Sequence, residues 1–507
     1  MADSWMAQRR AGVVLHPTSL PGPHGAGDFG PNAYYFVDWL QSAGQTLWQT
    51  LPLGPVGPGY SPYMGSSAFA GNPLLVAFEP LVQRGWLEAA SLQAPWDEGR
   101  IDYTELMPWR MQHLRTAFAG FQRLASEQEH SELAAWAQSQ SAWLDDYTLF
   151  MALDQAYSPA LWPQWPQGLA QRASAEMAAA RQQHAAEIAF WGFVQWQFEC
   201  QWQAIKTYAN SKGVCLIGDL PIFVAHHSAD CWARPDLYEL DAQGQPRVIA
   251  GVPPDFFSAT GQRWGNPLYN WAAMAQDGYR WWIERVRRQL HLADVVRIDH
   301  FRGFVDYWEI PADEPTAVKG CWQPGPGEAL FTALAQALGD LPIIAEDLGI
   351  ITPAVGALRE RIGFPGMRVL QFAFAGDAGN AFLPHNFEPN TVVYTGTHDN
   401  DTVPGWWASC TAHERAFAAQ YLGLQDGQGI DVHWAMLRAA SFSVARLALC
   451  QFQDVLGLDS QHRMNTPGTM GCWSWRFKWE WVGPQVAQHL VRITAASGRV
   501  GFERLPL

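Results

Sequence analysis

Eight short apolar runs, spread along most of the chain, constrain the fold more than any other feature of the sequence. Most are continuously apolar rather than alternating, as in parallel strands covered on both faces. Helical segments such as 279–292 and 329–338 separate several of them. The runs span residues 12–16, 47–53, 214–219, 294–299, 341–346, 367–372, 392–398 and 452–456. This alternation favours an α/β fold of the (β/α)8 TIM-barrel type, although the pattern alone also fits a doubly wound sheet.

Two long gaps between the runs predict material inserted into the barrel. Residues 82–212 have the apolar spacing of helices, for example at Leu114, Phe118 and Phe121, and indicate a helical subdomain. Residues 221–270 are rich in Gly, Pro and aromatic residues and indicate a loop-rich subdomain that covers the site. The last run lies near the C-terminus, which leaves little room for a separate β-sandwich. We therefore expect one catalytic barrel over residues 1–507 with two insertions.

The composition points away from charged partners. The net charge is −15, whereas binding to nucleic acid or an anionic membrane requires clustered Lys and Arg. The seven cysteines are scattered without a CxxC pair, and neither an N-terminal apolar segment nor a membrane-length apolar stretch is evident. These features predict a cytoplasmic enzyme. The 27 tryptophans suggest carbohydrate binding, but a large core also buries aromatic side chains.

Acidic residues end four of the predicted strands. They are Asp219, Asp299, the pair Glu346 and Asp347, and Asp399. A single acid in such a place commonly caps a helix or forms a turn, because burying it unpaired is costly. Four of them at strand ends predict a carboxylate cluster, because these ends meet at one mouth of a barrel.

Chemistry at a glycosidic bond requires such a cluster. One carboxylic acid protonates the leaving oxygen, and a carboxylate on the other side attacks the anomeric carbon. Arg297 lies two residues before Asp299, so in a strand both side chains point to the same face, and a neighbouring Arg favours an ionised carboxylate. Glu346 is the candidate acid, because burial or a nearby carboxylate can keep such a group protonated near neutral pH.

Seven sequence motifs identify a family. Three of them resemble the catalytic strand ends of the α-amylase clan: VVRIDHFRGF (295–304), IIAEDLG (343–349) and VVYTGTHDNDT (392–402). With four others, the set resembles the amylomaltases or disproportionating enzymes, the 4-α-glucanotransferases of glycoside hydrolase family 77. These four are HPTSLPGP (16–23), SPYMGSSAFAGNPLL (61–75), GDLPIFVA (218–225) and GVPPDFFSATGQRWGNPLYNW (251–271). The likeness extends to NTPG (465–468), and thus over essentially the whole chain.

The resemblance implies the catalytic roles. Asp299 is expected to be the nucleophile, Glu346 the general acid and base, and Asp399 the stabiliser of the transition state. Asp401 lies two residues beyond Asp399, but the His-Asp pair of the clan selects Asp399. Asp347 is set aside in favour of Glu346 in the same way.

The resemblance also implies a set of residues that bind the glucan. Arg297 is expected to orient the nucleophile, and Asp219 and His398 to contact the sugar at the cleavage point. Ser61 and Tyr63 are expected to hold the donor. Asp255, Gln262 and Trp264 are expected to shape the acceptor site on a covering loop, and Asn465 to form a second lip of the cleft. A tryptophan such as Trp264 can equally pack in a core, but its Gly-, Pro- and polar-rich surroundings favour a sugar platform.

The implied reaction is a retaining double displacement without a metal or cofactor. A segment of an α-1,4-glucan moves from a donor maltooligosaccharide to the 4-hydroxyl of glucose or another glucan. An α-glucan hydrolase with the same carboxylates and an inactive glucan-binding barrel remain alternatives. A nucleotide-dependent transferase is disfavoured, because no Gly-rich phosphate loop follows the first strands. His226 and His227 are adjacent, cannot comfortably chelate one metal on a strand, and are expected to be solvated.

Overall fold

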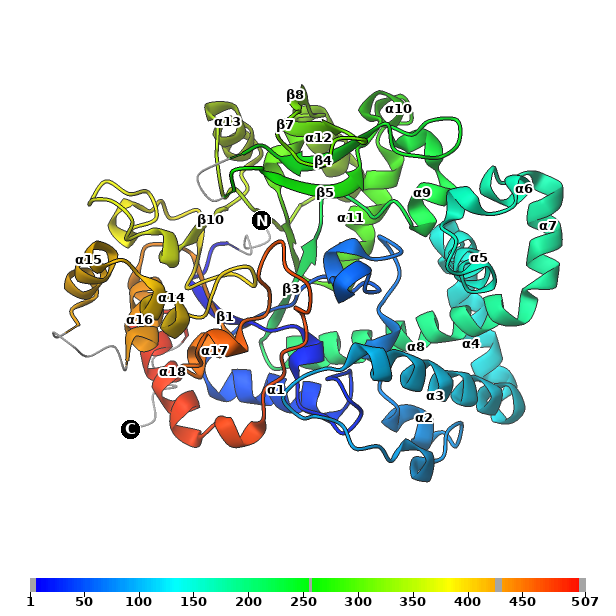
Figure 1. Ribbon diagram of the computed structural model, residues 1–507. Coiled ribbons are helices and arrows are strands. Elements are labelled where there is room, and N and C mark those ends of the chain that lie inside the picture. Colours follow the sequence, from blue (N-terminus) through cyan, green and yellow to red (C-terminus); the bar gives the residue numbers. More distant parts are fainter. Residues whose placement is uncertain (1–5, 255–257, 425–430, 501–507) are drawn as a thin grey trace.

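Eight parallel strands form the centre of the computed structural model (Figure 1), which describes residues 6–254, 258–424 and 431–500. Their order is β10-β11-β12-β1-β2-β3-β6-β9. The N–H of Ala345 at the end of β9 donates to the carbonyl of Pro365, just before β10, at 3.0 Å. The two outer strands are therefore neighbours, and the sheet closes into the predicted barrel. The strands are β1 (Arg10–Val14), β2 (Leu47–Gln49), β3 (Cys215–Leu220), β6 (Val295–Ile298), β9 (Ile343–Ala345), β10 (Gly366–Val369), β11 (Thr391–Tyr394) and β12 (Leu447–Gln451).

Helices cover the outside of the barrel, which explains why the strands are apolar on both faces. All residues of β6, β11 and β12 are buried. No helix in the described ranges is long and apolar enough to cross a membrane. The helices that follow or flank the strands are α1 (Pro31–Ser42), α11 (Arg280–Leu292), α12 (Glu328–Leu338), α13 (Pro353–Ile362), α14 (Val403–Ser409), α15 (Ala412–Leu422), α16 (Val432–Phe442) and α18 (Pro484–Ala496).

The predicted eighth strand was wrong. Residues 452–456 were expected to form it, but Phe452–Val455 is a short helix, α17, and the strand is the preceding segment, Leu447–Gln451. This strand pairs with both β1 and β11. Both segments are buried, and a short run such as 452–456, in which Gln453 and Asp454 interrupt the apolar residues, cannot be assigned to strand or helix by periodicity alone.

Helices fill the chain between β2 and β3, on the right of Figure 1. The longest, α8, carries a row of buried aromatic residues and packs against α1 and α5. The helix α4 begins with a capping box, in which the side chains of Ser126 and Glu129 each bind the other's backbone N–H. The helices of this region are α2 (Glu79–Gln83), α3 (Tyr103–Leu124), α4 (Glu127–Ser139), α5 (Ser141–Tyr157), α6 (Gln167–Ala170), α7 (Ser174–Gln183) and α8 (Ala185–Ser211).

A second, antiparallel sheet lies above the barrel in Figure 1, in the order β5-β4-β7-β8. The segment expected to be loop-rich, 221–270, supplies β4 (Val248–Val252), β5 (Gln262–Pro267) and α9 (Ala229–Ala233), and α10 (Trp271–Gln276) follows it directly. The chain after Asp299 supplies β7 (Asp306–Pro311) and β8 (Cys321–Pro324). The sequence did not predict this sheet, because β4 pairs with β7 across more than fifty residues and its own segment is rich in turn-forming residues.

Candidate active site

Strand register brings the acidic residues of three strands together. Asp219 in β3 lies opposite Arg297 in β6, and Ile298 in β6 lies opposite Ala345 in β9. Asp299 and Glu346 each follow the last residue of their strand, so they are neighbours at the carboxyl end of the barrel.

Arg297 connects two of these carboxylates. Its buried guanidinium donates to Asp219 Oδ1 at 2.7 Å and to Asp299 Oδ1 at 2.9 Å. The side chain of Asp219 is fully buried, whereas that of Asp299 is 32% exposed. Removing a partner from a buried ion pair is costly, so this arrangement fixes the orientation of Asp299 while leaving it open to a substrate.

Glu346 is held by backbone amides beside Asp299. The N–H of His300 donates to Glu346 Oε2 at 2.7 Å, and the N–H of Leu348 donates to Oε1 at 2.8 Å. Burial and the charge of Asp299 raise the pKa of Glu346 to about 7, against the opposing effects of Arg297 and the two amides. Glu346 can therefore take up or release a proton near neutral pH.

Asp399 lies in the middle of the loop between β11 and α14, beside two partners. Asn465 Nδ2 donates to its Oδ1 at 2.6 Å, and His398 Nε2 lies 3.3 Å from the same oxygen. Its side chain is 48% exposed. The loop that contains Asn465 thus forms a lip beside this carboxylate.

Tyr63 joins the two sides of the site. Its hydroxyl donates to Asp219 Oδ2 at 2.6 Å and lies 3.3 Å from His398 Nδ1, while its ring stacks on that of His398 at 4.9 Å. A continuous series of polar contacts therefore crosses the mouth. We call it the site network, and its members in order are Asp299, Arg297, Asp219, Tyr63, His398 and Asp399.

The two neighbouring acids are bound away from this network. Asp347 accepts from the N–H of Met367 at 2.6 Å and lies 3.3 Å from Arg359 Nε. The carboxylate of Asp401 accepts from the hydroxyl of Ser460 at 2.7 Å. Both are engaged by the scaffold, which leaves Glu346 and Asp399 as the acids directed to the site.

The family of the chain follows from its similarity to known proteins. The protein-family model described as 4-alpha-glucanotransferase matches residues 15–481 of the chain. The chain belongs to this family. The 4-alpha-glucanotransferase of Thermus thermophilus is 48% identical over 97% of this chain and 99% of its own length. The chloroplastic or amyloplastic 4-alpha-glucanotransferase of Solanum tuberosum is 45% identical, over 92% of this chain and 82% of its own.

Solved structures agree with this membership. The amylomaltase from Streptococcus agalactiae in complex with acarbose has a TM-score of 0.94 and 38% identity to the chain, over 97% of this chain and 100% of its own. The amylomaltase from Corynebacterium glutamicum, at 19% identity, has a TM-score of 0.79 over 97% of this chain and 76% of its own, and supports the fold alone.

The remaining candidate residues of this 4-alpha-glucanotransferase that the structure describes lie beside the network. Trp264 on β5 donates from Nε1 to Gln262 Oε1 at 3.0 Å, and its ring meets that of His300 edge-on at 4.9 Å. It is neither core nor free surface, because it is half-buried against the residue that follows Asp299. Ser61 caps the short helix Pro62–Met64 by accepting from the N–H of Tyr63. Asp255 lies outside the described residues.

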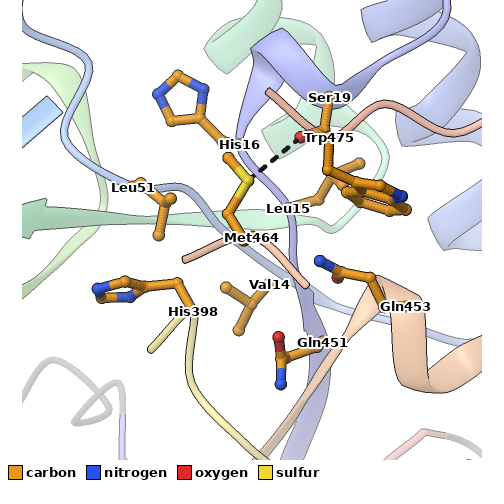
Figure 2. Close-up of a pocket in the computed structure, with 10 residues that line it drawn as sticks. All are labelled: Val14, Leu15, His16, Ser19, Leu51, His398, Gln451, Gln453, Met464 and Trp475. Atoms are coloured by element: carbon orange, nitrogen blue, oxygen red, sulfur yellow. Dashed lines mark hydrogen bonds between the residues drawn. The ribbon is translucent and has the colours of Figure 1, made fainter. Parts of the chain in front are cut away.

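Sequence reasoning missed several side chains near the site of this family member. Figure 2 shows a pocket behind His398, lined in part by His16 and Met464. Trp473 lies 5.6 Å from the ring of Tyr63 and 5.8 Å from that of His398. The motif that starts at His16 carried the only available signal, and it did not distinguish contact residues from scaffold.

The expectation that His226 and His227 are solvated was wrong. Both are half-buried: His226 Nε2 lies 2.7 Å from the carbonyl of Gly244, and His227 Nε2 lies 2.6 Å from Asp154 Oδ1. Because Asp154 belongs to α5, His227 joins the segment after β3 to the helical region. Such contacts between distant segments are invisible to local pattern.

Proposed function

We propose that this member of the 4-alpha-glucanotransferase family transfers segments of α-1,4-glucans by a retaining double displacement. Asp299 attacks the anomeric carbon while Glu346 protonates the departing glycosidic oxygen, and a glycosyl-enzyme ester forms. The 4-hydroxyl of glucose or of another α-1,4-glucan then attacks the same carbon, Glu346 takes its proton, and Asp299 leaves.

One observation carries this proposal: two adjacent carboxyl groups with opposite environments. Asp299 is bound by a guanidinium and open to solvent, whereas Glu346 is buried with its pKa raised to about 7. A pair of this kind assigns the nucleophile and the acid. Retention further requires a separation of roughly 5–5.5 Å between the two carboxyl groups.

The other residues bind the donor and acceptor sugars. Asp399 stabilises positive charge at the anomeric carbon. Together with Asp219 and His398 it forms hydrogen bonds with the hydroxyls of that sugar. Tyr63 contacts the donor glucan, and its position in the site network supports that role. Ser61 lies beside it on the donor side, Asn465 forms the second lip, and Asp255, Gln262 and Trp264 shape the acceptor site.

Hydrolysis is the competing function, because water and sugar can attack the same intermediate. Incubation with maltotriose separates the two reactions. Transfer gives a ladder of longer and shorter glucans with glucose, whereas hydrolysis gives only shorter products. A chain that leaves maltotriose unchanged would be an inactive glucan-binding barrel.

Two aspartates at opposite ends of β6 provide a matched test of the assignment. Asp299→Asn should abolish the ladder. Asp294→Asn should keep it, because Asp294 lies at the amino end of the strand and accepts from the N–H of Leu216 at 2.7 Å. Near-normal transfer by Asp299→Asn would contradict the proposal.

Two broader expectations belong to this proposal. We place the enzyme in the cytoplasm, which is supported by the seven cysteines all being free thiols. We also treat residues 82–212 and 221–270 as subdomains inserted into a single barrel, which is supported by their positions after β2 and β3.

A further inference from the structure

One segment of the chain makes many of the contacts to the loop that carries His398 and Asp399. We call residues 395–403 the Asp399 loop. Outside that segment, Tyr63 contacts His398, and Gln371 Nε2 donates to the Asp401 carbonyl at 2.7 Å. Five residues of the segment 451–465 make further contacts to the loop. They are Gln451 to the Asp401 carbonyl (3.2 Å), Asp454 to Thr395 and Val403, Ser460 to the Asp401 carboxylate (2.7 Å), Arg463 to the Asp399 carbonyl (2.6 Å) and Asn465 to the Asp399 carboxylate (2.6 Å).

Asp454 has a special place in this set because it binds both ends of the loop. Its Oδ2 accepts from the Thr395 hydroxyl at 2.6 Å, and its Oδ1 accepts from the Val403 N–H at 2.6 Å. Thr395 directly follows β11, and Val403 is the first residue of α14. The carboxylate therefore closes the loop at its base.

The chemistry of Asp454 is costly for a purely structural residue. It is completely buried, and within the described parts of the chain it takes part in no ion pair. Its charged neighbour, Asp401, has the same sign, and burial together with that charge raises the pKa of Asp454 to about 7. Burying a carboxyl group without a cation is unfavourable unless its hydrogen bonds compensate.

An amide could replace this carboxylate in part. The Asn oxygen can accept from the Val403 N–H while its amide nitrogen donates to the Thr395 hydroxyl, which can also accept a hydrogen bond. Removal of both bonds therefore requires an apolar side chain of similar shape, as in Asp454→Leu.

We propose that Asp454 is a positioning residue for the glycosyl transfer, because it holds the Asp399 loop and with it His398 and Asp399 in register with Asp299. Asp454 itself does not touch the reacting atoms. Asp399 is half-exposed and is bound through its side chain by only two described neighbours, so its position depends on the backbone of its loop. A misplacement of about 1 Å at a reacting group can cost about 100-fold in rate.

The proposal rests on the role given to Asp399 under the proposed function, and kinetics with maltotriose test it. Asp454→Leu removes both bonds and should lower kcat by roughly 10- to 100-fold with KM changed by less than about threefold, because the loss acts on the transition state. Thr395→Val removes one of the two bonds at nearly constant volume and should lower kcat by about three- to tenfold. If the wild-type enzyme gives no ladder of products from maltotriose, the proposed function is contradicted. If it gives the ladder and the variants keep the wild-type kcat, only the role of Asp454 is contradicted.

A control variant separates positioning from general stability. Glu199 is another buried acid, paired with Arg288 at 2.7 Å on the outer helices α8 and α11. Glu199→Gln should lower the midpoint of thermal unfolding and leave kcat within about twofold of wild type. A loss of kcat in Glu199→Gln equal to that in Asp454→Leu, at equal loss of thermal stability, would overturn the proposal.

The double variant tests the route of the effect. If Asp454 acts through Thr395, the Asp454→Leu, Thr395→Val double variant should have the kcat of Asp454→Leu alone, whereas independent effects would multiply. An Asp454→Leu enzyme with kcat within twofold of wild type overturns the inference. If that variant does not fold, Thr395→Val decides, and an unchanged kcat overturns it equally.

Discussion

The backbone N–H of His300 donates a hydrogen bond of 2.7 Å to the carboxylate of Glu346. The residue that follows Asp299 therefore holds the side chain of the neighbouring acid. His300 has a left-handed backbone, with φ of 55°, which is uncommon for residues other than glycine and is found at functional sites. The two carboxyl groups are thereby fixed relative to each other through one strained residue.

The raised pKa of Glu346 predicts the alkaline limb of the activity profile. Glu346 must be protonated to donate to the leaving oxygen, so kcat/KM should fall about tenfold per pH unit above a pH near 7. Glu346→Gln should lower kcat by about 10²- to 10⁴-fold and remove this limb. Initial rates with maltotriose from pH 5 to pH 9 measure both. A limb that persists unchanged in the variant would assign it to another group.

The same shift predicts a cost in stability. The pKa of Glu346 is about 7 in the folded chain and near 4.5 when unfolded, so the folded state binds the proton more tightly. Stability should therefore fall as pH rises from about 4.5 to 7, by an amount on the order of 3 kcal/mol. Glu346→Gln should unfold at a higher temperature than wild type at pH 8 and at the same temperature near pH 4. Equal midpoints at both pH values would contradict this.

Arg297 should matter for both stability and catalysis, because its guanidinium lies between two carboxylates and binds both. Arg297→Ala leaves Asp219 and Asp299 without their common partner and should cost about 3–5 kcal/mol of unfolding free energy. Arg297→Lys keeps the charge but cannot reach both acids in the same geometry, and should retain more stability than activity. Denaturant unfolding and kcat, measured on the same preparations, give the comparison. A stable Arg297→Ala enzyme would refute the pairing.

Asn465 should act on catalysis with little effect on folding. Asn465→Ala removes the 2.6 Å bond to Asp399 on a half-exposed lip, and should lower kcat by about 10- to 150-fold, the range expected for a hydrogen bond to a charged group. Asn390→Ala is a suitable control, since among the described residues the Asn390 side chain donates only to the exposed carbonyl of Gly363. A similar loss of kcat in both variants would argue against a role for Asn465.

Much of the barrel could be predicted because its determinants are local. Seven of the eight apolar runs overlap observed strands, since a strand buried on both faces must be apolar along its length. The eighth was displaced by a few residues onto α17, whose four residues FQDV are all buried although two of them are polar. The antiparallel sheet was missed, because its strands pair at long range and carry turn-forming residues.

The sequence by itself determined the kind of fold, the family and the residues that matched its motifs, because these follow from composition, periodicity and local order along the chain. Only the tertiary structure decided how those residues act together. Three features arise between segments far apart in sequence. They are the contact between Tyr63 and His398, the raised pKa of Glu346 and the hydrogen bonds of Asp454 to the Asp399 loop. Hydrogen bonds and desolvation depend on distance in space, and a linear pattern does not contain that distance.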